Sequence, residues 1–400
     1  MFDELFRCPV VAARYRKGPM SEERLAFLTH HANQGYSRNT LRKEANSLLL
    51  VAQMLELASQ PRKLLRAAEI KHKMANRRHL YPLARRWLQF IGRLRQPPIP
   101  LTPCAKKINV YADYMEHEAE LSPETIYSRC DWTKRLLDRL HVKDGCLHKV
   151  TPYRIDMAFQ EMLQSGGYSR KTIQGCATIL RSFFRFAEAR GWCRKGLAAS
   201  IQNPRVFSQT SLPLGPSWED VRRLLAMTEG DKPSDIRARP ILMLFAVYGL
   251  RRGEVGRLRL EDFDWEHEEF RVVSSKTGRV RTYPLTRSVG DAILRYLQEV
   301  RPRSPHRELF LSLRAPIRPL HRSVTDVVRE RLESLHVRLP HYGPHVLRHA
   351  CASRLLAAGL SLKEIGDQLG HVNPESTRIY AKVDLAGLRK VADFELGGVL

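Results

Sequence analysis

The sequence predicts a multidomain protein in which two all-α segments precede a mixed α+β segment with a small antiparallel sheet. Two proline-rich stretches, "RQPPIPLTPC" at 95–104 and "IQNPRVFSQTSLPLGPS" at 201–217, are typical of linkers within the 400 residues. Apolar residues recur at helical spacing before the second stretch, and an alternating pattern with a central turn follows it. We therefore expect domains at 1–95, 103–200 and 215–400, with a linker at 201–214.

The first segment is predicted to be helical and basic. Ser37 and Asn39 are candidate N-caps, because short polar side chains accept hydrogen bonds from the first free amides of a helix. Apolar residues follow at helical spacing: Leu41, Ala45, Leu48, Leu49, Ala52 and Leu55. The stretch "YSRNTLRKEANSLL" is echoed by "YSRKTIQGCATIL" in the second segment, 132 residues later. The echo indicates either shared helix-start chemistry or a second helical module for the same partner.

The second segment is also predicted to be helical. In "SPETIYSRCDWTKRLLDRL" a serine cap is followed by proline at the first helical position. "SRKTIQGCATILRSFFRFAEARG" places apolar side chains along one face and ends at Gly191. That face comprises Ile173, Cys176, Ala177, Leu180, Phe183, Phe184 and Ala187. Lys171, Arg181 and Arg185 on the opposite face are candidate contacts for an anionic partner.

The third segment mixes helix and strand. "SWEDVRRLLAM" and the apolar run "ILMLFAVYGL" predict helices, the second one buried and ending at Arg251. "FRVVSSKTGRVRTYPL" alternates around a turn at Lys276–Gly278 and predicts a β-hairpin. Three helices are expected to follow, at 343–359, 361–370 and around Tyr380. A last short helix is expected to carry Leu385, Leu388, Val391 and Phe394 on one side.

Charge favours a polyanionic partner. The chain has 67 Lys+Arg against 42 Asp+Glu, a net charge of +25, and nucleic acid is the usual partner of such a surplus. A ribosome-like or merely basic protein is the alternative, and a membrane surface is disfavoured because the surplus is spread along the chain. The seven cysteines form no C-x-x-C pair, which disfavours a disulfide framework or zinc ribbon. No signal peptide or membrane span is predicted, so we expect a cytoplasmic location.

Charged residues gather where the buried helix of the third segment should end. In "YGLRRGEVGRL" Arg251 offers a planar, always-charged fork that fits a phosphate with two hydrogen bonds. Glu254, three residues on, is placed to pair with Arg251. Taken alone, the two residues fit a structural ion pair at a helix end better than a phosphate site.

Further groups favour phosphate chemistry. "HVLR" puts His345 and Arg348 on one side of a first helical turn, and Lys276 lies in the hairpin turn. His371 and Tyr380 follow nine residues apart. Two-metal carboxylate spacing and a G-x-x-x-x-G-K-[ST] loop are both absent from the sequence, so we expect no metal and no cofactor. His345 and His349 have zinc-ligand spacing within "HVRLPHYGPHVLRH", but the glutamate of H-E-x-x-H is missing.

Five blocks in order, "YGLRRGE", "SSKTGRVRTYPL", "HVLRH", "LGH" and "STRIY", resemble the tyrosine recombinases of the phage-integrase family. The resemblance covers the third segment, extends more loosely to the second, and leaves out the first. It implies a helical core-binding domain at 103–200 and a catalytic domain at 215–400 that close round duplex DNA. Tyr248 and Gly253 stand where the family often has Thr and Ser, and neither change removes a reacting group.

The resemblance implies a role for each candidate residue. Tyr380 would be the nucleophile that forms a 3′-phosphotyrosyl bond, and Arg251 and Arg348 would bind the non-bridging oxygens. Lys276 would protonate the leaving 5′-oxygen. His345 would be the general base and His371 a hydrogen-bond donor to the phosphate. Glu254 would orient Arg251.

The expected function is recombination of a mobile element, for integration, excision or transposition. The implied partners are double-stranded DNA and further copies of the chain in a tetramer, with the tail at 385–396 docking on the next subunit. Sibling recombinases or accessory DNA-bending proteins are further candidate partners. Two alternatives stay open: a catalytically silent DNA-binding relative, and a type IB topoisomerase-like enzyme.

Overall fold

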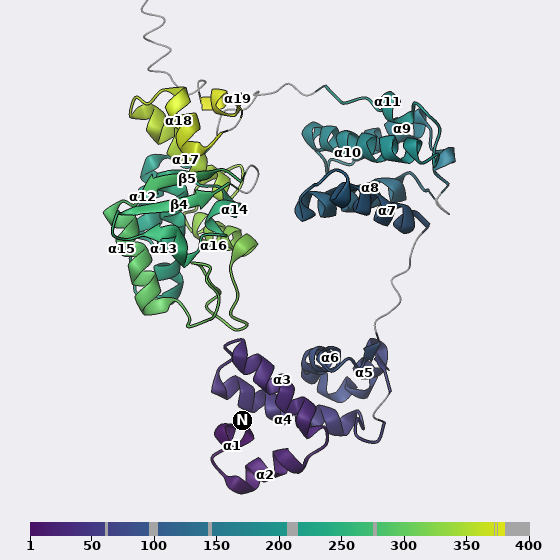
Figure 1. Cartoon of the computed structure of the whole chain (residues 1–400), viewed down its shortest axis with the longest axis vertical. Helices are drawn as coiled ribbons and strands as arrows, with labels where there is room; N and C mark the ends of the chain where they lie inside the picture. The colour runs from purple at the N-terminus through teal and green to yellow at the C-terminus, as the bar shows by residue number, and fades with distance from the viewer. Residues whose placement is uncertain are drawn as a thin grey trace, which may run out of the picture. The chain divides into compact units, whose positions relative to one another are not determined.

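The computed structural model describes residues 1–60, 63–95, 103–142, 146–205, 215–274, 278–371, 373 and 375–380. The chain divides into two compact units, one of Met1–Gln96 with Ser211–Leu400 and the other of Pro97–Thr210. Figure 1 shows the helices and strands along the chain, coloured by residue number. Separate hydrophobic clusters form within the first 95 residues, within the second unit, and within the segment from residue 215. The division into three domains stays a prediction.

The first 95 residues are mostly helical. The helices are α1 (Phe2–Leu5), α2 (Pro9–Lys17), α3 (Ser21–Asn33), α4 (Arg38–Met54), α5 (Ala67–Lys73) and α6 (Tyr81–Phe90), with a 3₁₀ turn at Ala75–Leu80. Two-residue strands β1 (Leu65–Arg66) and β2 (Leu94–Arg95) pair in parallel. All six apolar positions predicted for α4 are buried. Ser37 is the N-cap, accepting a hydrogen bond from the Thr40 amide.

The second unit is a helical bundle, as predicted. It contains α7 (Pro103–His117), α8 (Pro123–Arg139), α9 (Pro152–Gln164), α10 (Arg170–Ala189) and α11 (Leu197–Ser200), with a 3₁₀ turn at Leu147–Lys149. The predicted apolar face of α10 is buried along its whole length. This follows from its spacing, which keeps the apolar side chains on one side of twenty residues of helix.

The echo between the first two segments coincides with a shared helix start. Ser37 and Ser169 each cap a helix by accepting from the amide three residues on, and each hydroxyl lies 2.9 Å from a threonine hydroxyl. Ser122, outside the echo, forms the same arrangement with Thr125. Helix-start chemistry alone therefore accounts for the repeated Ser-x-x-Thr.

The segment from residue 215 combines helices with a small sheet. Its helices are α12 (Trp218–Ala226), α13 (Pro233–Tyr248), α14 (Arg252–Val255), α15 (Arg287–Arg295), α16 (Val324–Glu333), α17 (Pro344–Ala357), α18 (Leu362–Leu369) and α19 (Glu375–Arg378). Strands β3 (Phe263–Asp264), β4 (Glu269–Val273) and β5 (Val280–Pro284) form an antiparallel sheet in that order. The predicted hairpin is β4–β5, with Val273 opposite Val280. The fold class agrees with the prediction.

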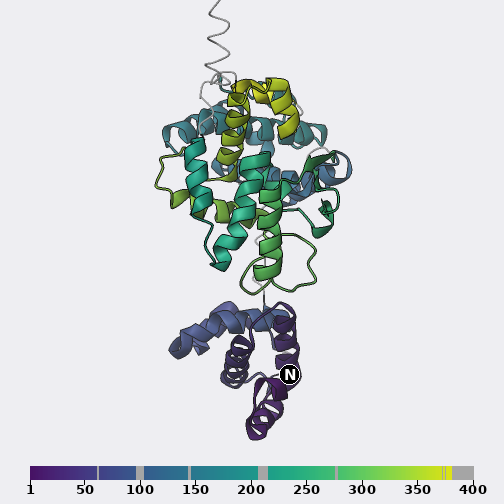
Figure 2. The same cartoon turned by 90° about the vertical axis from the view of Figure 1, so that its left-hand side faces the viewer.

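Helix α13 lies at the centre of this segment. It packs against α12, α15 and α17, and Figure 2 shows α12, α13 and α15 side by side. Its residues from Ile241 to Phe245 are almost fully buried. At its end, the Tyr248 hydroxyl donates to the Pro284 carbonyl at 2.9 Å and accepts from the Thr286 amide at 3.0 Å. These two bonds fix the end of α13 against the sheet, where the candidate site begins.

All seven cysteines lie within the described ranges, and none of them forms a disulfide there. None of the helices described here combines the length and apolar character that a bilayer crossing requires.

Candidate active site

Arg251 does not end the buried helix, as the sequence suggested, but starts the next one. Helix α13 ends at Tyr248, and Gly249 adopts the left-handed conformation at φ 62° that turns the chain. Arg251 is the N-cap of α14. Its amide and its Nη1 both donate to Glu254, at 2.7 and 3.1 Å. The predicted Arg251–Glu254 pair is therefore built into a single helix start.

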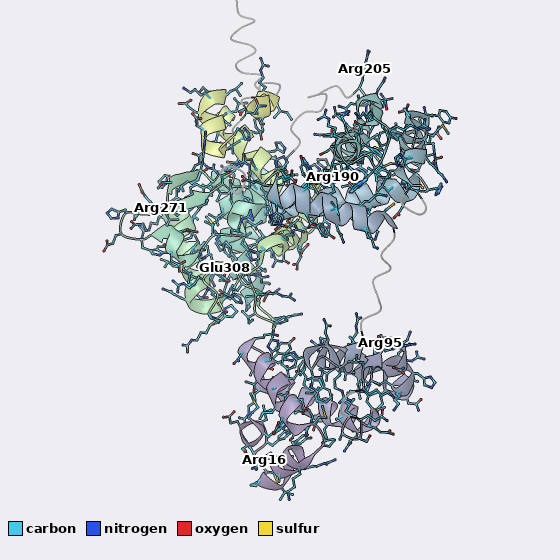
Figure 3. All side chains as sticks on the ribbon, turned by 45° about the vertical axis from the view of Figure 1, so that its right-hand side comes forward. Arg16, Arg95, Arg190, Arg205, Arg271 and Glu308 are labelled. Carbon is cyan, nitrogen blue, oxygen red and sulfur yellow. The ribbon has the colours of Figure 1, made fainter. Side chains whose placement is uncertain are left out.

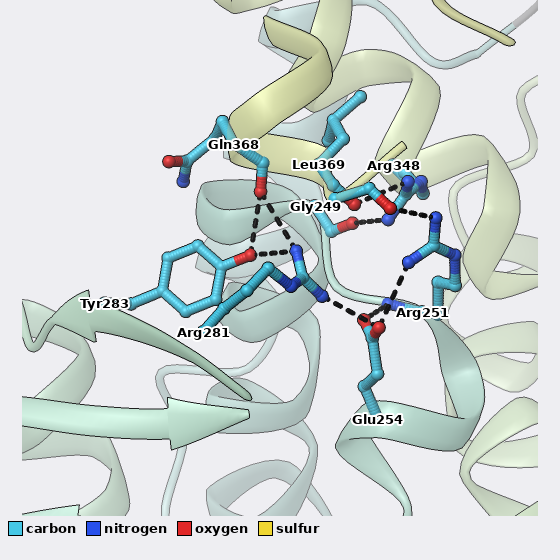
Figure 4. Close-up of polar contacts among 9 residues, drawn as sticks. Gly249, Arg251, Glu254, Arg281, Tyr283, Arg348, Gln368 and Leu369 are labelled. Atoms are coloured by element: carbon cyan, nitrogen blue, oxygen red, sulfur yellow. Dashed lines mark hydrogen bonds and ion pairs between the residues drawn. The ribbon is translucent and has the colours of Figure 1, made fainter. Parts of the chain in front are cut away.

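Glu254 joins two arginines. Its side chain is fully buried, and its Oε1 accepts from Arg251 Nη1 and from Arg281 Nη2, the latter at 2.8 Å. Figure 4 shows the carboxylate between the two guanidinium groups. A buried carboxylate without a partner would be costly, so these two ion pairs compensate the burial of Glu254.

The two predicted arginines are anchored on neighbouring turns. Arg348, on α17, is 3% exposed and donates to the carbonyls of Gly249 and Leu369, at 2.5 and 2.8 Å. Arg251 donates through Nη2 to the carbonyl of Gly370 at 2.7 Å. Burial, and next the positive charge of Arg251, lower the pKa of Arg348 to about 10, so it stays charged at neutral pH. We call Arg251 and Arg348 the arginine pair.

His371 follows the end of α18. Gly370 is the left-handed C-cap at φ 65°, and the His371 amide donates to the Gly366 carbonyl at 2.8 Å. The imidazole Nδ1 lies 2.7 Å from the Thr377 hydroxyl, within hydrogen-bonding distance. Burial, followed by the charges of Arg348 and Arg251, lowers the pKa of His371 to about 4. The ring is therefore neutral at physiological pH, next to the arginine pair.

Tyr380 is buried in an apolar cluster. It is 2% exposed and packs in one cluster with Cys351, Ile365 and Leu369. Its hydroxyl forms a 2.9 Å hydrogen bond with Nδ1 of His349 on α17. Burial raises the pKa of Tyr380 to about 12, although the positive charge of Arg348 opposes this. The phenol is therefore protonated and covered in this state.

Comparison with known proteins places these residues in a family. Residues 217–386 match the Phage integrase family. The tyrosine recombinase XerC of Alcanivorax borkumensis is 30% identical over 299 residues, which span 72% of this chain and 92% of that protein. The chain belongs to the phage integrase family of tyrosine recombinases.

Two solved structures share the fold of this recombinase. One is the Tn1549 transposon integrase in complex with circular intermediate DNA, with 20% identity, a TM-score of 0.55, and coverage of 72% of this chain and 99% of that one. The other is a lambda integrase dimer bound to a COC′ core site, with 16% identity, a TM-score of 0.55, and coverage of 69% and 94%. At these identities the likeness concerns the fold alone.

Within this recombinase, the histidine that contacts Tyr380 is not the predicted one. His345 lies on the outer side of α17, and its ring centre is 4.4 Å from that of His349. His349 carries the bond to Tyr380, and its pKa is lowered to about 4 by burial and then by His345. The sequence did offer a signal, because residues four apart share a helix face, but that spacing suggested a zinc pair. The role of His345 as general base stays a prediction.

Arg281 is the second residue that the sequence reasoning missed. It lies on β5, five residues after Lys276, and reaches the carboxylate that orients Arg251. The sequence contained a clue to this position. Side chains of a strand point alternately to its two faces, so residue 281 lies on the same face of the hairpin as Tyr283.

The remaining predicted residues lie elsewhere. Lys276 falls outside the described residues, so only its flanking strands β4 and β5 are placed. In α10, Lys171 and Arg185 are exposed, whereas Arg181 donates to the Ile201 carbonyl at 2.9 Å and to Asn203 at 2.8 Å. In the part of the chain that the structure covers, no cluster of three His, Cys, Asp or Glu side chains is arranged to hold a metal.

Proposed function

We propose that the protein is a site-specific DNA recombinase that cuts and rejoins strands through a covalent bond to Tyr380, for movement of a mobile element. The observation that carries the proposal is the arginine pair, held on the Gly249, Leu369 and Gly370 carbonyls beside the neutral His371. Two fixed guanidinium groups suit the non-bridging oxygens of one phosphate, whose negative charge grows in the transition state.

The reaction is a transesterification. The Tyr380 oxygen attacks the phosphorus, the bond to the 5′-oxygen breaks, and a 3′-phosphotyrosyl ester and a free 5′-hydroxyl form. The phenol proton goes to a histidine, for which His345 is the proposed base, and Lys276 supplies the proton of the leaving oxygen. His371 donates a hydrogen bond to the phosphate. Before attack, Tyr380 exchanges its bond with His349 for contact with DNA.

The covalent bond makes an external energy source unnecessary. One phosphodiester is replaced by one phosphotyrosyl ester, and attack by a 5′-hydroxyl of another strand reverses the exchange. The arginine pair, rather than a metal ion, supplies the positive charge in this scheme.

Two rival functions have less support. A catalytically silent DNA-binding relative would be expected to lack at least one reacting side chain, yet Arg251, Arg348, His371 and Tyr380 are all present. A type IB topoisomerase-like enzyme would use the same chemistry without a docking tail. The apolar tail at 385–396 lies outside the described residues, and we propose that it docks on the next subunit of a DNA-bound tetramer. Deletion of this tail should abolish the synaptic complex on a native gel while leaving binding to a single site.

A nicked suicide duplex tests the proposed chemistry. The duplex carries the end sequence of the encoding element, and loss of a short fragment prevents religation. In EDTA, wild type should form a protein–DNA adduct on a denaturing gel, and Tyr380→Phe should form none because it lacks the nucleophilic oxygen. Binding of the duplex by both proteins without any adduct would favour the silent relative, and an adduct with Tyr380→Phe would contradict the role of Tyr380.

A further inference from the structure

Arg281 occupies an unexpected position in the sheet. In the register of β4 and β5, Phe270 is opposite Tyr283 and Val272 is opposite Arg281, so these four side chains share one face. Phe270, Val272 and Tyr283 are buried in the core. Arg281 is the only charged side chain on this face of the two strands, both of which are fully described. A charge at such a position requires partners.

The partners of Arg281 come from both sides of the candidate site. Its Nη2 donates to Glu254 Oε1 at 2.8 Å, and its Nη1 donates to the Gln368 carbonyl at 3.3 Å and to the Tyr283 hydroxyl (Figure 4). Tyr283 in turn donates to the same Gln368 carbonyl at 2.7 Å. One guanidinium therefore joins the hairpin, the carboxylate that holds Arg251, and the last turn of α18.

The guanidinium also lies directly against Gly370. A Cβ built at this glycine would overlap the Arg281 guanidinium. The carbonyl of Gly370 accepts from Arg251, and His371 follows it. Arg281 is thus in van der Waals contact with the turn that carries His371 and whose carbonyl anchors Arg251.

Arg281 also shares the negative charge of Glu254 with Arg251. If Glu254 were paired with Arg251 alone, its full negative charge would offset that arginine and reduce its attraction for a phosphate. Because Oε1 is shared with Arg281, one carboxylate is set against two guanidinium groups. Arg251 then keeps more of its positive field while its geometry stays fixed.

Resting on the proposed function, we propose that Arg281 is a positioning residue that sets the orientation and effective charge of Arg251 through Glu254, and links the β4–β5 hairpin to the phosphate site. A purely structural role is the competing explanation, since any cation would offset the buried Glu254. The two explanations differ in what the loss of Arg281 changes. Loss of a positioning residue slows cleavage, and slows it more on a charged phosphate than on a neutral one. Loss of a purely structural residue lowers the stability of the protein alone.

The variants are chosen to separate these effects in the full-length protein. Arg281→Ala removes the cation, and Arg281→Lys keeps a charge for Glu254 without the planar fork. Arg271→Ala is the matched control, because Arg271 (Figure 3) lies on β4 opposite Thr282, on the other face of the same hairpin, and is exposed. Glu254→Gln, alone and combined with Arg281→Ala, completes a double-mutant cycle.

Two nicked suicide duplexes serve as probes, one with the natural phosphate and one with a neutral methylphosphonate at the cleaved position. At saturating natural duplex, Arg281→Ala should form adduct roughly tenfold to a hundredfold more slowly than wild type, with Arg281→Lys in between. Arg271→Ala should keep the wild-type cleavage rate. On the methylphosphonate the Arg281→Ala defect should nearly vanish, because there is less charge for Arg251 to stabilise. The variant that combines Glu254→Gln with Arg281→Ala should form adduct no more slowly than the slower of the two single variants.

Several results would overturn the inference. Adduct formation by Arg281→Ala at the rate of Arg271→Ala, with only a lower melting temperature, would show a structural role. Equal defects on both duplexes, or additive effects in the cycle, would mean that Arg281 does not act through Glu254 on the phosphate. If Arg281→Ala does not fold, the rates of adduct formation by Arg281→Lys and wild type on the two duplexes decide between the positioning and the structural role. Absence of adduct with wild type itself would instead reject the proposed function.

Discussion

At the scale of residues, Tyr380, His349 and His371 are held in their uncharged forms. Burial raises the pKa of Tyr380 to about 12 and lowers those of His349 and His371 to about 4. A neutral imidazole is able to accept a proton, and a protonated phenol does not react before it is deprotonated. In the proposed mechanism, Tyr380 is therefore unreactive until contact with DNA rearranges these groups.

The lowered pKa values of His349 and His371 predict that the protein is less stable in acid. In the unfolded chain an imidazole binds a proton near pH 6.5, whereas native His349 and His371 do so only near pH 4. As the pH falls through this window the unfolded state binds more protons, so the free energy of unfolding decreases, by on the order of 2 kcal/mol for each histidine. Above pH 6.5 this contribution is fully present.

Urea unfolding between pH 7 and pH 4 measures this effect. His349→Gln should flatten the loss of stability with falling pH relative to wild type, and His79→Gln, which alters an exposed histidine, should not. If the free energy of unfolding fell with pH equally for wild type and His349→Gln, burial of His349 would not be a cause of the loss of stability in acid.

The sequence singles out candidate residues, whose catalytic roles stay predictions, but it does not reveal the contacts that they make. Arg251, Glu254, Arg348, His371 and Tyr380 were chosen from five short blocks. The fold brings the first four together around the turns at Gly249 and Gly370, and Tyr380 packs in the cluster that contains Leu369. Arg281 and His349 were missed because their importance lies in partners 27 and 31 residues away along the chain. Helical or strand spacing gives the face on which a side chain lies, but not the distant atom that it meets.

At the scale of elements, the site depends on how helices end. Caps, helical periods and the hairpin were predictable because each depends on a few adjacent residues, as at Ser37, Ser122 and Ser169. The end of α13 was predicted wrongly, at Arg251, because the turn at Gly249 ends the apolar helix three residues earlier, at Tyr248. That turn is what exposes the Gly249 carbonyl to Arg348.

Substitution of Gly249 tests this turn. Its φ of 62° disfavours a side chain, and a Cβ there would overlap Leu369 and lie 3.3 Å from Cys351 Sγ. Gly249→Ala should therefore lower stability by about 1–3 kcal/mol. Gly175→Ala, inside α10 with open space around it, should raise stability by about 0.5–1 kcal/mol. Thermal unfolding that shifts in the same direction for both variants would contradict this account of the turn.

At the scale of the whole molecule, charge predicts how DNA is bound. A net charge of +25 implies that phosphate contacts dominate affinity and that binding weakens steeply with salt. Arg185 is exposed on the charged side of α10. Arg185→Ala should weaken binding to all DNA sequences about equally and reduce the salt slope by about 1. Fluorescence anisotropy at several salt concentrations measures both quantities, and a loss confined to one base position would count against the phosphate role.

The central claim is that Tyr380 becomes covalently attached to DNA, and peptide mapping of the adduct tests it most directly. Trypsin cleavage after Arg378 and Lys382 would release the four-residue peptide "IYAK", whose single tyrosine is Tyr380. After nuclease digestion, mass spectrometry should find a nucleotide joined through its 3′-phosphate to this peptide. A nucleotide on any other peptide, or one joined through a 5′-phosphate, would contradict the account.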